Sequence, residues 1–120
     1  GAEVLFRRAL TIADTTYGPA HREVAIDVNN LGRVLQDKGD LDGAEAMVRR
    51  ALTIDEKTYG PDHPKLAIRL NNLGLVLHDK GDRDGARALL QRAVDILRRA
   101  LGPNHPQAKL AERNLARLGP

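Results

Sequence analysis

Residues 29–51 read NNLGRVLQDKGDLDGAEAMVRRA, and residues 71–93 read NNLGLVLHDKGDRDGARALLQRA. The second stretch repeats the first after a step of 42 residues. The same step relates residues 1–42 to residues 43–84, which are identical at 27 of 42 positions, and 12 of the last 36 residues also match. A period of this length is typical of a solenoid, in which each repeat is one supersecondary unit.

Each repeat predicts two helices. Apolar residues recur at helical spacing in residues 21–38 and again in residues 41–58, with Gly39 as the break between them. Gly60-Pro61 ends the second helix, because proline cannot continue it, and Pro64 is expected in the first turn of the next one. No strand pattern competes with this interpretation.

The predicted fold is therefore all-α, an α-solenoid of six helices arranged as antiparallel hairpins, with about 2.9 repeats. We expect one domain, residues 1–120, whose parts are an orphan second helix (1–18), a repeat (19–60), a further repeat (61–102) and a partial repeat with a first helix only (103–120). Small residues such as Gly32, Ala44 and Ala51 are expected where paired helices cross closely.

Composition excludes several classes of function. The chain of 120 residues has no cysteine and no serine, which removes disulfides, thiolate metal sites and a serine nucleophile. Aromatic residues make up 2% of the sequence, too few for the stacking platforms of single-strand nucleic-acid binders. No apolar run reaches the roughly 20 residues that span a bilayer. We therefore expect no enzyme, no cofactor, no membrane insertion and no preference for nucleic acid.

The charged residues suggest an uneven surface rather than a catalytic site. The net charge is +3, and the positive excess lies from Arg83 onward. This could favour an acidic partner, although a solvated helix surface explains it equally simply. Histidines recur at His21, His63 and His105, one period apart, which is too far for one metal ion. We expect them to make polar contacts at helix starts.

The first helix of each repeat is predicted to carry a binding face opposite its core face. Successive residues lie about 100° apart around a helix, so Leu31 and Leu35 face the core while the opposite side lines the concave surface. The candidate groove residues on that side are Ile26, Asn29, Asn30, Arg33, Gln36, Ile68, Asn71, Asn72, Leu75, His78, Leu110, Arg113, Asn114 and Arg117.

The asparagines on this face have two alternative roles. A carboxamide both donates and accepts hydrogen bonds, so it can pair with the backbone of an extended peptide. Alternatively, asparagines on neighbouring first helices can bond to each other and hold the curvature. Both roles are compatible with different members of each pair.

The sequence resembles the tetratricopeptide repeat family. The matching skeleton is Leu31-Gly32, Leu35, Gly39, Ala44, Val48 and Ala51, which returns 42 residues later. The step of 42 residues and the segments Gly60-Pro61-Asp62-His63-Pro64 and Leu70-Asn71-Asn72-Leu73 are similar to the kinesin-light-chain variety. The resemblance implies a protein-interaction scaffold whose asparagines contact cargo peptides, and the absence of cysteine fits the cytoplasmic location that we expect. The carboxylate-clamp subclass has lysine where this chain has Ile26 and Ile68, so chaperone tails are not expected.

Two hypotheses about function follow. The first is a scaffold that binds an extended, preferably acidic, peptide segment in the concave groove. The second is a structural repeat segment, a natural fragment or a consensus-like design, that associates head to tail with other copies. The near-identity of the first two repeats and the start at Gly rather than Met favour the second. The differences between Arg33 and Leu75 and between Gln36 and His78 favour the first.

Overall fold

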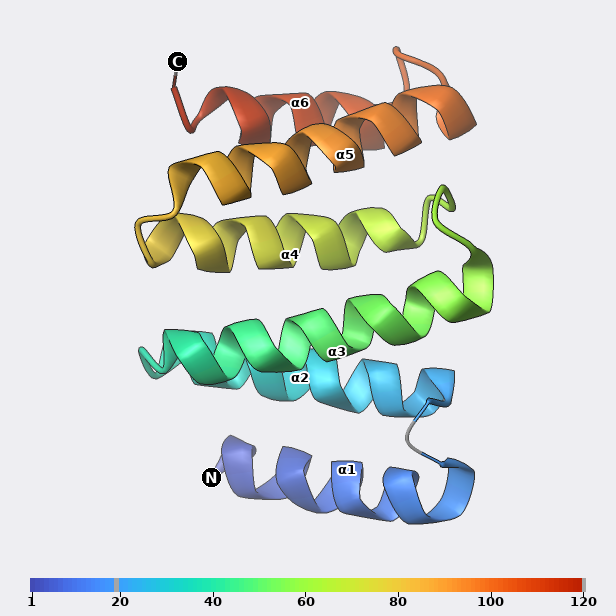
Figure 1. Cartoon of the computed structure of the whole chain (residues 1–120), viewed down its shortest axis with the longest axis vertical. Helices are drawn as coiled ribbons and strands as arrows, with labels where there is room; N and C mark the ends of the chain where they lie inside the picture. Colours follow the sequence, from blue (N-terminus) through green and yellow to red (C-terminus); the bar gives the residue numbers. More distant parts are fainter. Residues whose placement is uncertain (19, 120) are drawn as a thin grey trace. The chain divides into compact units, whose positions relative to one another are not determined.

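The computed structural model describes residues 1–18 and 20–119 of the chain. Within them it contains six α-helices and no strand, as the repeat predicts (Figure 1). The helices are α1 (Ala2–Tyr17), α2 (Arg22–Asp37), α3 (Leu41–Tyr59), α4 (Leu66–Asp79), α5 (Arg83–Leu101) and α6 (Pro106–Ala116). Pro19, in the first Tyr-Gly-Pro link, lies outside the described residues.

The start of α4 differs from the expectation. Pro64 was expected in the first turn of this helix, yet α4 begins at Leu66. The N–H groups of Leu66 and Ala67 donate to the carbonyl oxygens of His63 and Pro64, three residues back, so a tighter turn precedes the helix. Pro106, one period later, does occupy the first turn of α6.

The chain divides into two compact units, residues 1–58 and residues 59–120. The first unit contains α1, α2 and nearly all of α3, and its core is aliphatic. The core residues are Ala13, Val24, Ala25, Val28, Ala51 and Ile54, with Leu10 and Met47 packed against them. Because no aromatic side chain takes part, close packing of small and branched residues supplies the stabilisation.

Charged pairs connect the helices of the first unit at its surface. Nζ of Lys38, just after α2, lies 2.6 Å from Oε1 of Glu3 in α1. In the same unit, Nη2 of Arg50 in α3 lies 2.8 Å from Oδ1 of Asp14 in α1. Lys38 and Arg7 together lower the pKa of Glu3, because both donate hydrogen bonds to its carboxylate. Both pairs connect α1 to the rest of the unit, and the Lys38–Glu3 pair, whose lysine is exposed, contributes little to stability.

A Gly-Asp pair forms the turn inside each hairpin. Gly39 has a φ of 86°, a conformation that favours glycine, and the N–H of Asp40 donates to the carbonyl oxygen of Leu35 at 2.8 Å. The carboxylate of Asp40 then accepts a hydrogen bond from the N–H of Gly43 at 3.0 Å. The pair therefore ends one helix and caps the next. Gly81 and Asp82 repeat this arrangement in the second unit.

The second unit, residues 59–120, contains α4, α5 and α6. The crossing of α4 and α5 is close, as the small residues predict. A Cβ atom placed on Gly74 would lie 3.0 Å from Cγ of Leu90 and 3.3 Å from the carbonyl oxygen of Ala86. Two guanidinium groups at the start of α5, those of Arg83 and Arg87, donate to the carbonyl oxygens of Leu118 and Gly119 beyond α6.

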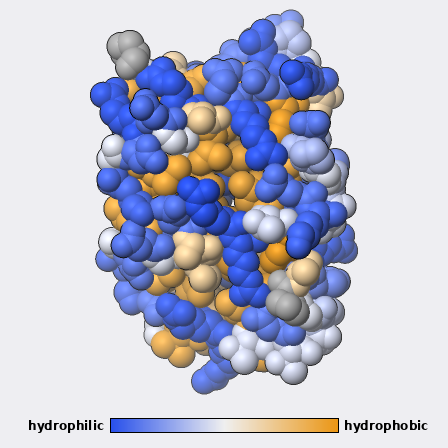
Figure 2. All heavy atoms as spheres, in the orientation of Figure 1, coloured by the Kyte–Doolittle hydropathy of each residue, from blue (hydrophilic) through white to orange (hydrophobic). Residues whose placement is uncertain are grey.

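None of the helices in the described residues is long and apolar enough to cross a membrane. The surface nevertheless exposes several large apolar side chains, and Figure 2 shows apolar patches among the polar and charged ones on the face in view.

Candidate functional site

The predicted division between core face and exposed face is confirmed on the first helices. Ile26, Ile68 and Leu110 are 45%, 63% and 51% exposed. Leu31 and Leu73, which were assigned to the core, are completely buried. An exposed aliphatic residue therefore recurs at the same position of α2, α4 and α6.

In the second unit the exposed face contains a hollow, the α4–α6 cavity, with a volume of about 410 Å³. It is lined by Pro64, Lys65, Ala67, Ile68, Asn71, Ala93, Leu97, Gln107, Leu110, Ala111 and Asn114. Its size falls in the lower part of the usual range for ligand pockets, about 300–1,000 Å³. Four of the predicted groove residues meet here: Ile68, Asn71, Leu110 and Asn114.

The cavity exists because its floor is made of small side chains. Ala67 of α4, Ala93 of α5 and Ala111 of α6 are all less than 9% exposed, and Leu97 of α5 is 5% exposed. Alanines fill less of the space between three helices than leucines would. Ile68 and Leu110 also line the hollow and are exposed, so its lining is mainly apolar, with Gln107 and the two asparagines as uncharged polar members.

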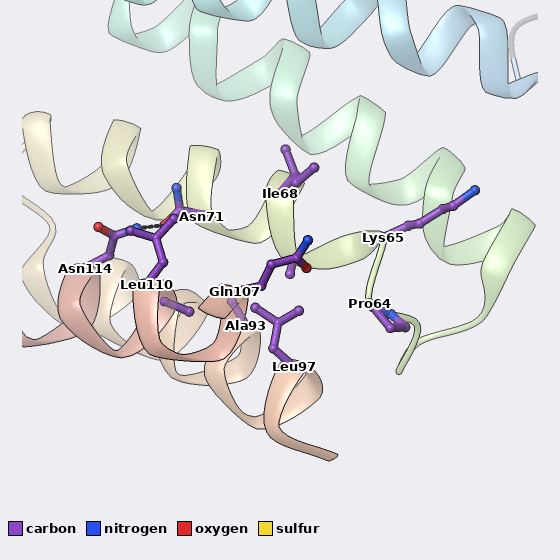
Figure 3. A pocket seen from close by; sticks show the side chains of 11 residues that line it. Pro64, Lys65, Ile68, Asn71, Ala93, Leu97, Gln107, Leu110 and Asn114 are labelled. Carbon is purple, nitrogen blue, oxygen red and sulfur yellow. Dashed lines mark hydrogen bonds between the residues drawn. The ribbon is translucent and has the colours of Figure 1, made fainter. Parts of the chain in front are cut away.

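An amide pair lies at one end of the cavity. Nδ2 of Asn114 in α6 donates to Oδ1 of Asn71 in α4 at 2.9 Å (Figure 3). The structure thus shows the interhelix role of asparagine at this pair. The bond uses one donor of Asn114 and the acceptor of Asn71, so Nδ2 of Asn71 and Oδ1 of Asn114 retain hydrogen-bonding capacity for a peptide backbone.

The opposite end of the cavity carries a positive charge. Lys65 extends away from the other labelled side chains in Figure 3, and its Nζ lies 4.7 Å from the ring centroid of Tyr59. The ring of Tyr59 also stacks on that of His63, with centroids 4.9 Å apart. The cation–π contact holds the lysine stem beside the rim and leaves its ammonium in solvent. Lys65 is the one charged residue among those that line the cavity.

His21 and His105 make the expected contacts at the starts of α2 and α6, whereas the equivalent bond of His63 lies in the turn before α4. Nδ1 of His21 accepts a hydrogen bond from the N–H of Glu23, and His63 and His105 accept equivalent bonds from the second residue after them, each at 3.1 Å. Among the described residues no group of histidine, aspartate and glutamate side chains is arranged to hold a metal ion.

In the first unit the structure modifies one expectation. Asn29 was placed on the exposed face but is only 5% exposed. The reason is its angular position, since Asn29 lies within about 60° of Ala25 and Gly32, which are both buried. Asn30 and Gln36 are half-buried, and Arg33 is exposed.

Asp27 follows Ile26 on α2 and has an unusual environment. Partial burial raises the pKa of Asp27, and the carboxylate of Glu23, one turn earlier, raises it further. The charged form of Asp27 is therefore a local cost to the folded state.

The remaining candidates of the second unit lie outside the α4–α6 cavity. Asn72 is half-buried, while Leu75, His78 and Arg117 are exposed and Arg117 follows the end of α6. Arg113 lines a separate shallow hollow on α6, together with Lys109, Glu112 and Ala116. In the second unit the structure thus gathers four of the predicted residues into one hollow and leaves the other candidates of that unit outside it.

Sequence reasoning missed much of the cavity lining. Pro64, Lys65, Ala67, Ala93, Leu97, Gln107 and Ala111 line it but were not among the candidates. A signal was present at two positions. Leu97 stands where the preceding repeat has Asp55, and Ala111 stands where it has Arg69.

Comparisons with known proteins agree with the geometry. A model of the tetratricopeptide repeat family matches residues 1–57, 26–99 and 70–118. A comparison with curated protein sequences finds no match.

Among solved structures, two similar chains carry helical repeats of the same fold. One contains nearly identical TPR-like repeats assigned to a kinesin light chain of Podosopora anserina, with a TM-score of 0.87, 23% identity, and coverage of 97% of this chain and 55% of that chain. The other is BtubC (BKLC) from P. vanneervenii, with a TM-score of 0.88, 24% identity, and coverage of 97% and 46%. This chain spans about half the length of these solved chains.

Proposed function

Because the chain belongs to the tetratricopeptide repeat family, we propose that it is a non-catalytic protein-interaction module that binds an extended peptide segment along the exposed face of its first helices. The observation that carries this proposal is the aliphatic α4–α6 cavity with hydrogen-bonding amides at its edge. Apolar hollows with a few polar groups at the rim are typical of ligand sites.

The chemistry of the site fits a peptide. Ile68 and Leu110 are exposed aliphatic residues that an apolar side chain can cover. The Asn71–Asn114 pair offers a donor and an acceptor, which matches the alternating N–H and C=O groups of an extended backbone. Such contacts bind backbone of any sequence, so the aliphatic cavity would supply the selectivity.

A peptide array probed with the whole chain tests this function. Ile68→Asp places a charge at the cavity rim and is expected to weaken binding about tenfold or more. The matched control is Ile12→Asp in α1, since Ile12 is similarly exposed at 60% and does not line the cavity. If no peptide binds the wild-type chain, or if both variants bind as it does, this function is wrong.

A second candidate function, association with other copies of the chain, is favoured by the surface of α1. Ile12 is 60% exposed, whereas its counterparts Ile54 and Ile96 are each 4% exposed. Leu5, on the same helix, is 65% exposed. A second copy would bury these side chains through a head-to-tail contact.

The surface of α6 does not complement α1 well. Lys109 and Glu112 stand where α4 has the buried residues Ala67 and Leu70.

Sedimentation of the wild type and of Leu5→Glu/Ile12→Glu over a wide concentration range tests the association. A monomeric mass for the wild type at every concentration would exclude it.

We further propose a cytoplasmic location and a partner that is a protein rather than a nucleic acid. The absence of cysteine is consistent with a reducing compartment. A fluorescent fusion tests the location. RNA affinity measured at two salt concentrations tests the partner class, since steep salt dependence would indicate phosphate contacts.

A further inference from the structure

We propose that the α4–α6 cavity determines which peptides the chain binds. The cavity accepts one aliphatic side chain of an extended peptide with an acidic flank, and Leu97 and Ala111 determine this choice. The inference rests on the proposed function and deepens it. Its basis is the composition of the cavity compared with the same positions elsewhere in the repeats.

The repeats differ at the cavity floor, within a part of the chain where 24 of the last 36 residues differ from their counterparts 42 residues earlier. The position that Leu97 occupies in α5 holds Ala13 in α1 and Asp55 in α3. The position of Ala111 holds Asp27 and Arg69. Each earlier pair therefore includes at least one charged residue, whereas the pair in the second unit is wholly aliphatic.

This difference matters because the side chains of the cavity floor are buried. Leu97 is 5% exposed and Ala111 is 8% exposed, so a side chain that enters the cavity touches groups removed from solvent. An aliphatic group gains free energy by burial there, while a charged group loses its hydration without gaining a partner. A charged floor would reverse that preference. The aliphatic floor is thus a property of the α4–α6 cavity and is not shared by the same positions of the earlier repeats.

The size and the charge of the site define the occupant. A volume of about 410 Å³ accommodates a side chain and its neighbouring backbone but not a folded domain. No carboxylate lines the cavity, and Lys65 stands at one end of it. The second unit carries eleven basic and six acidic side chains, a net charge of +5. An acidic residue next to the aliphatic one would lie toward Lys65, and the backbone on the other side of the aliphatic residue would lie at Asn71 and Asn114.

A double variant transplants the earlier residues into the cavity. Leu97→Asp/Ala111→Arg places in the α4–α6 cavity the carboxylate and guanidinium that the preceding repeat carries at the same positions. The net charge does not change. The matched control is Ala88→Asp/Ala100→Arg, because both alanines are exposed on α5 and neither lines the cavity. Ala111→Leu, which fills the hollow without a charge, keeps the test valid if the double variant does not fold. Circular dichroism and thermal unfolding establish that each variant is folded.

Two probes are used with these variants. The first is N-acetyl-leucine methylamide, followed through the methyl NMR signals of Ile68, Leu97 and Leu110. We expect saturable shifts of these signals in the wild type and in the control, and none in the double variant or in Ala111→Leu. The second is a library of random linear peptides selected on the wild type. Selected peptides are expected to share one aliphatic residue beside an acidic one and to bind the double variant about tenfold or more weakly.

The outcomes separate the inference from the proposed function. If peptides bind the folded double variant as tightly as the wild type, the cavity does not determine specificity. The proposed peptide-binding function is unaffected by that result. Absence of shifts with the leucine probe would also overturn the role of the cavity. Shifts with the leucine probe, together with a library that yields no binding peptide, would support an aliphatic pocket and overturn the peptide-binding function.

Discussion

Individual side chains in this molecule are best understood by comparison with their counterparts 42 residues away. Gly32 and Gly74 both occupy close crossings, so the repeat conserves the constraint within one chain. Leu97 and Asp55 share a position and are both buried but differ in chemistry, and the proposed specificity of the α4–α6 cavity rests on this difference. The counterpart also supplies a natural control for each substitution.

Gly74→Val should destabilise the second unit by about 2 kcal/mol, because Leu90 and the backbone of Ala86 leave no room for a branched side chain. Ala116→Val changes the counterpart position on α6, which is exposed, and should alter stability by less than about 0.5 kcal/mol. Chemical denaturation compares the two variants. Equal stability of both would show that the α4–α5 crossing tolerates side chains.

Asp27→Asn should stabilise the chain slightly at neutral pH, by at most about 0.5 kcal/mol, since the substitution removes a charge that burial and Glu23 disfavour. The sign follows from the raised pKa of Asp27. The cost of the charged form is absent in acid and appears as the pH rises through that pKa. Thermal unfolding of wild type and variant should therefore converge as the pH is lowered. A gain that is independent of pH would contradict this account.

At the scale of the helices, the sequence predicted the elements and most of their bounds but misplaced the start of α4. Periodicity and the Gly39-Asp40 pair located α2 and α3 to within one residue, because a positive-φ glycine and a capping aspartate leave little freedom. Pro64 was misplaced because proline is compatible both with a first helical turn and with the tight turn before α4. Local signals alone do not distinguish these two conformations.

His105→Ala should destabilise α6 by about 1 kcal/mol, because the imidazole Nδ1 caps the N–H of Gln107 at the start of a short helix. Amide hydrogen exchange in α6 measures the effect directly. His78→Ala is the control, as His78 is exposed at the end of α4 and caps no helix start. Faster exchange in α6 with His78→Ala than with His105→Ala would be evidence against the capping role.

For the whole molecule, the sequence predicted exposed aliphatic residues on the first helices but not the location of the cavity. Helical geometry correctly separated the exposed line of Ile26, Ile68 and Leu110 from the core. It did not predict a cavity at one part of that face, because a hollow depends on how three helices leave space above small floor residues. The pairing of Asn71 with Asn114 likewise depends on the distance between helices that are far apart in sequence.

The two compact units also differ in charge, which gives a prediction for the whole chain. The unit of residues 1–58 has a net charge of −2, against +5 for the unit of residues 59–120. Peptides selected on the chain that carry acidic flanks should lose affinity as salt rises from low to physiological concentration, while versions with amides in place of the acids should change little. Anisotropy titrations at both salt concentrations measure this. Identical salt dependence would remove the electrostatic contribution.

The guanidinium groups of Arg83 and Arg87 have a further consequence for motion. Their counterparts in the preceding repeat are Leu41 and Glu45, so the second unit alone ties the start of α5 to the carbonyl oxygens that follow α6. Terminal turns usually fray because their carbonyl groups lack partners. Here the start of α5 is hydrogen-bonded to the residues that follow α6, so these two segments are expected to unfold together as one cooperative element.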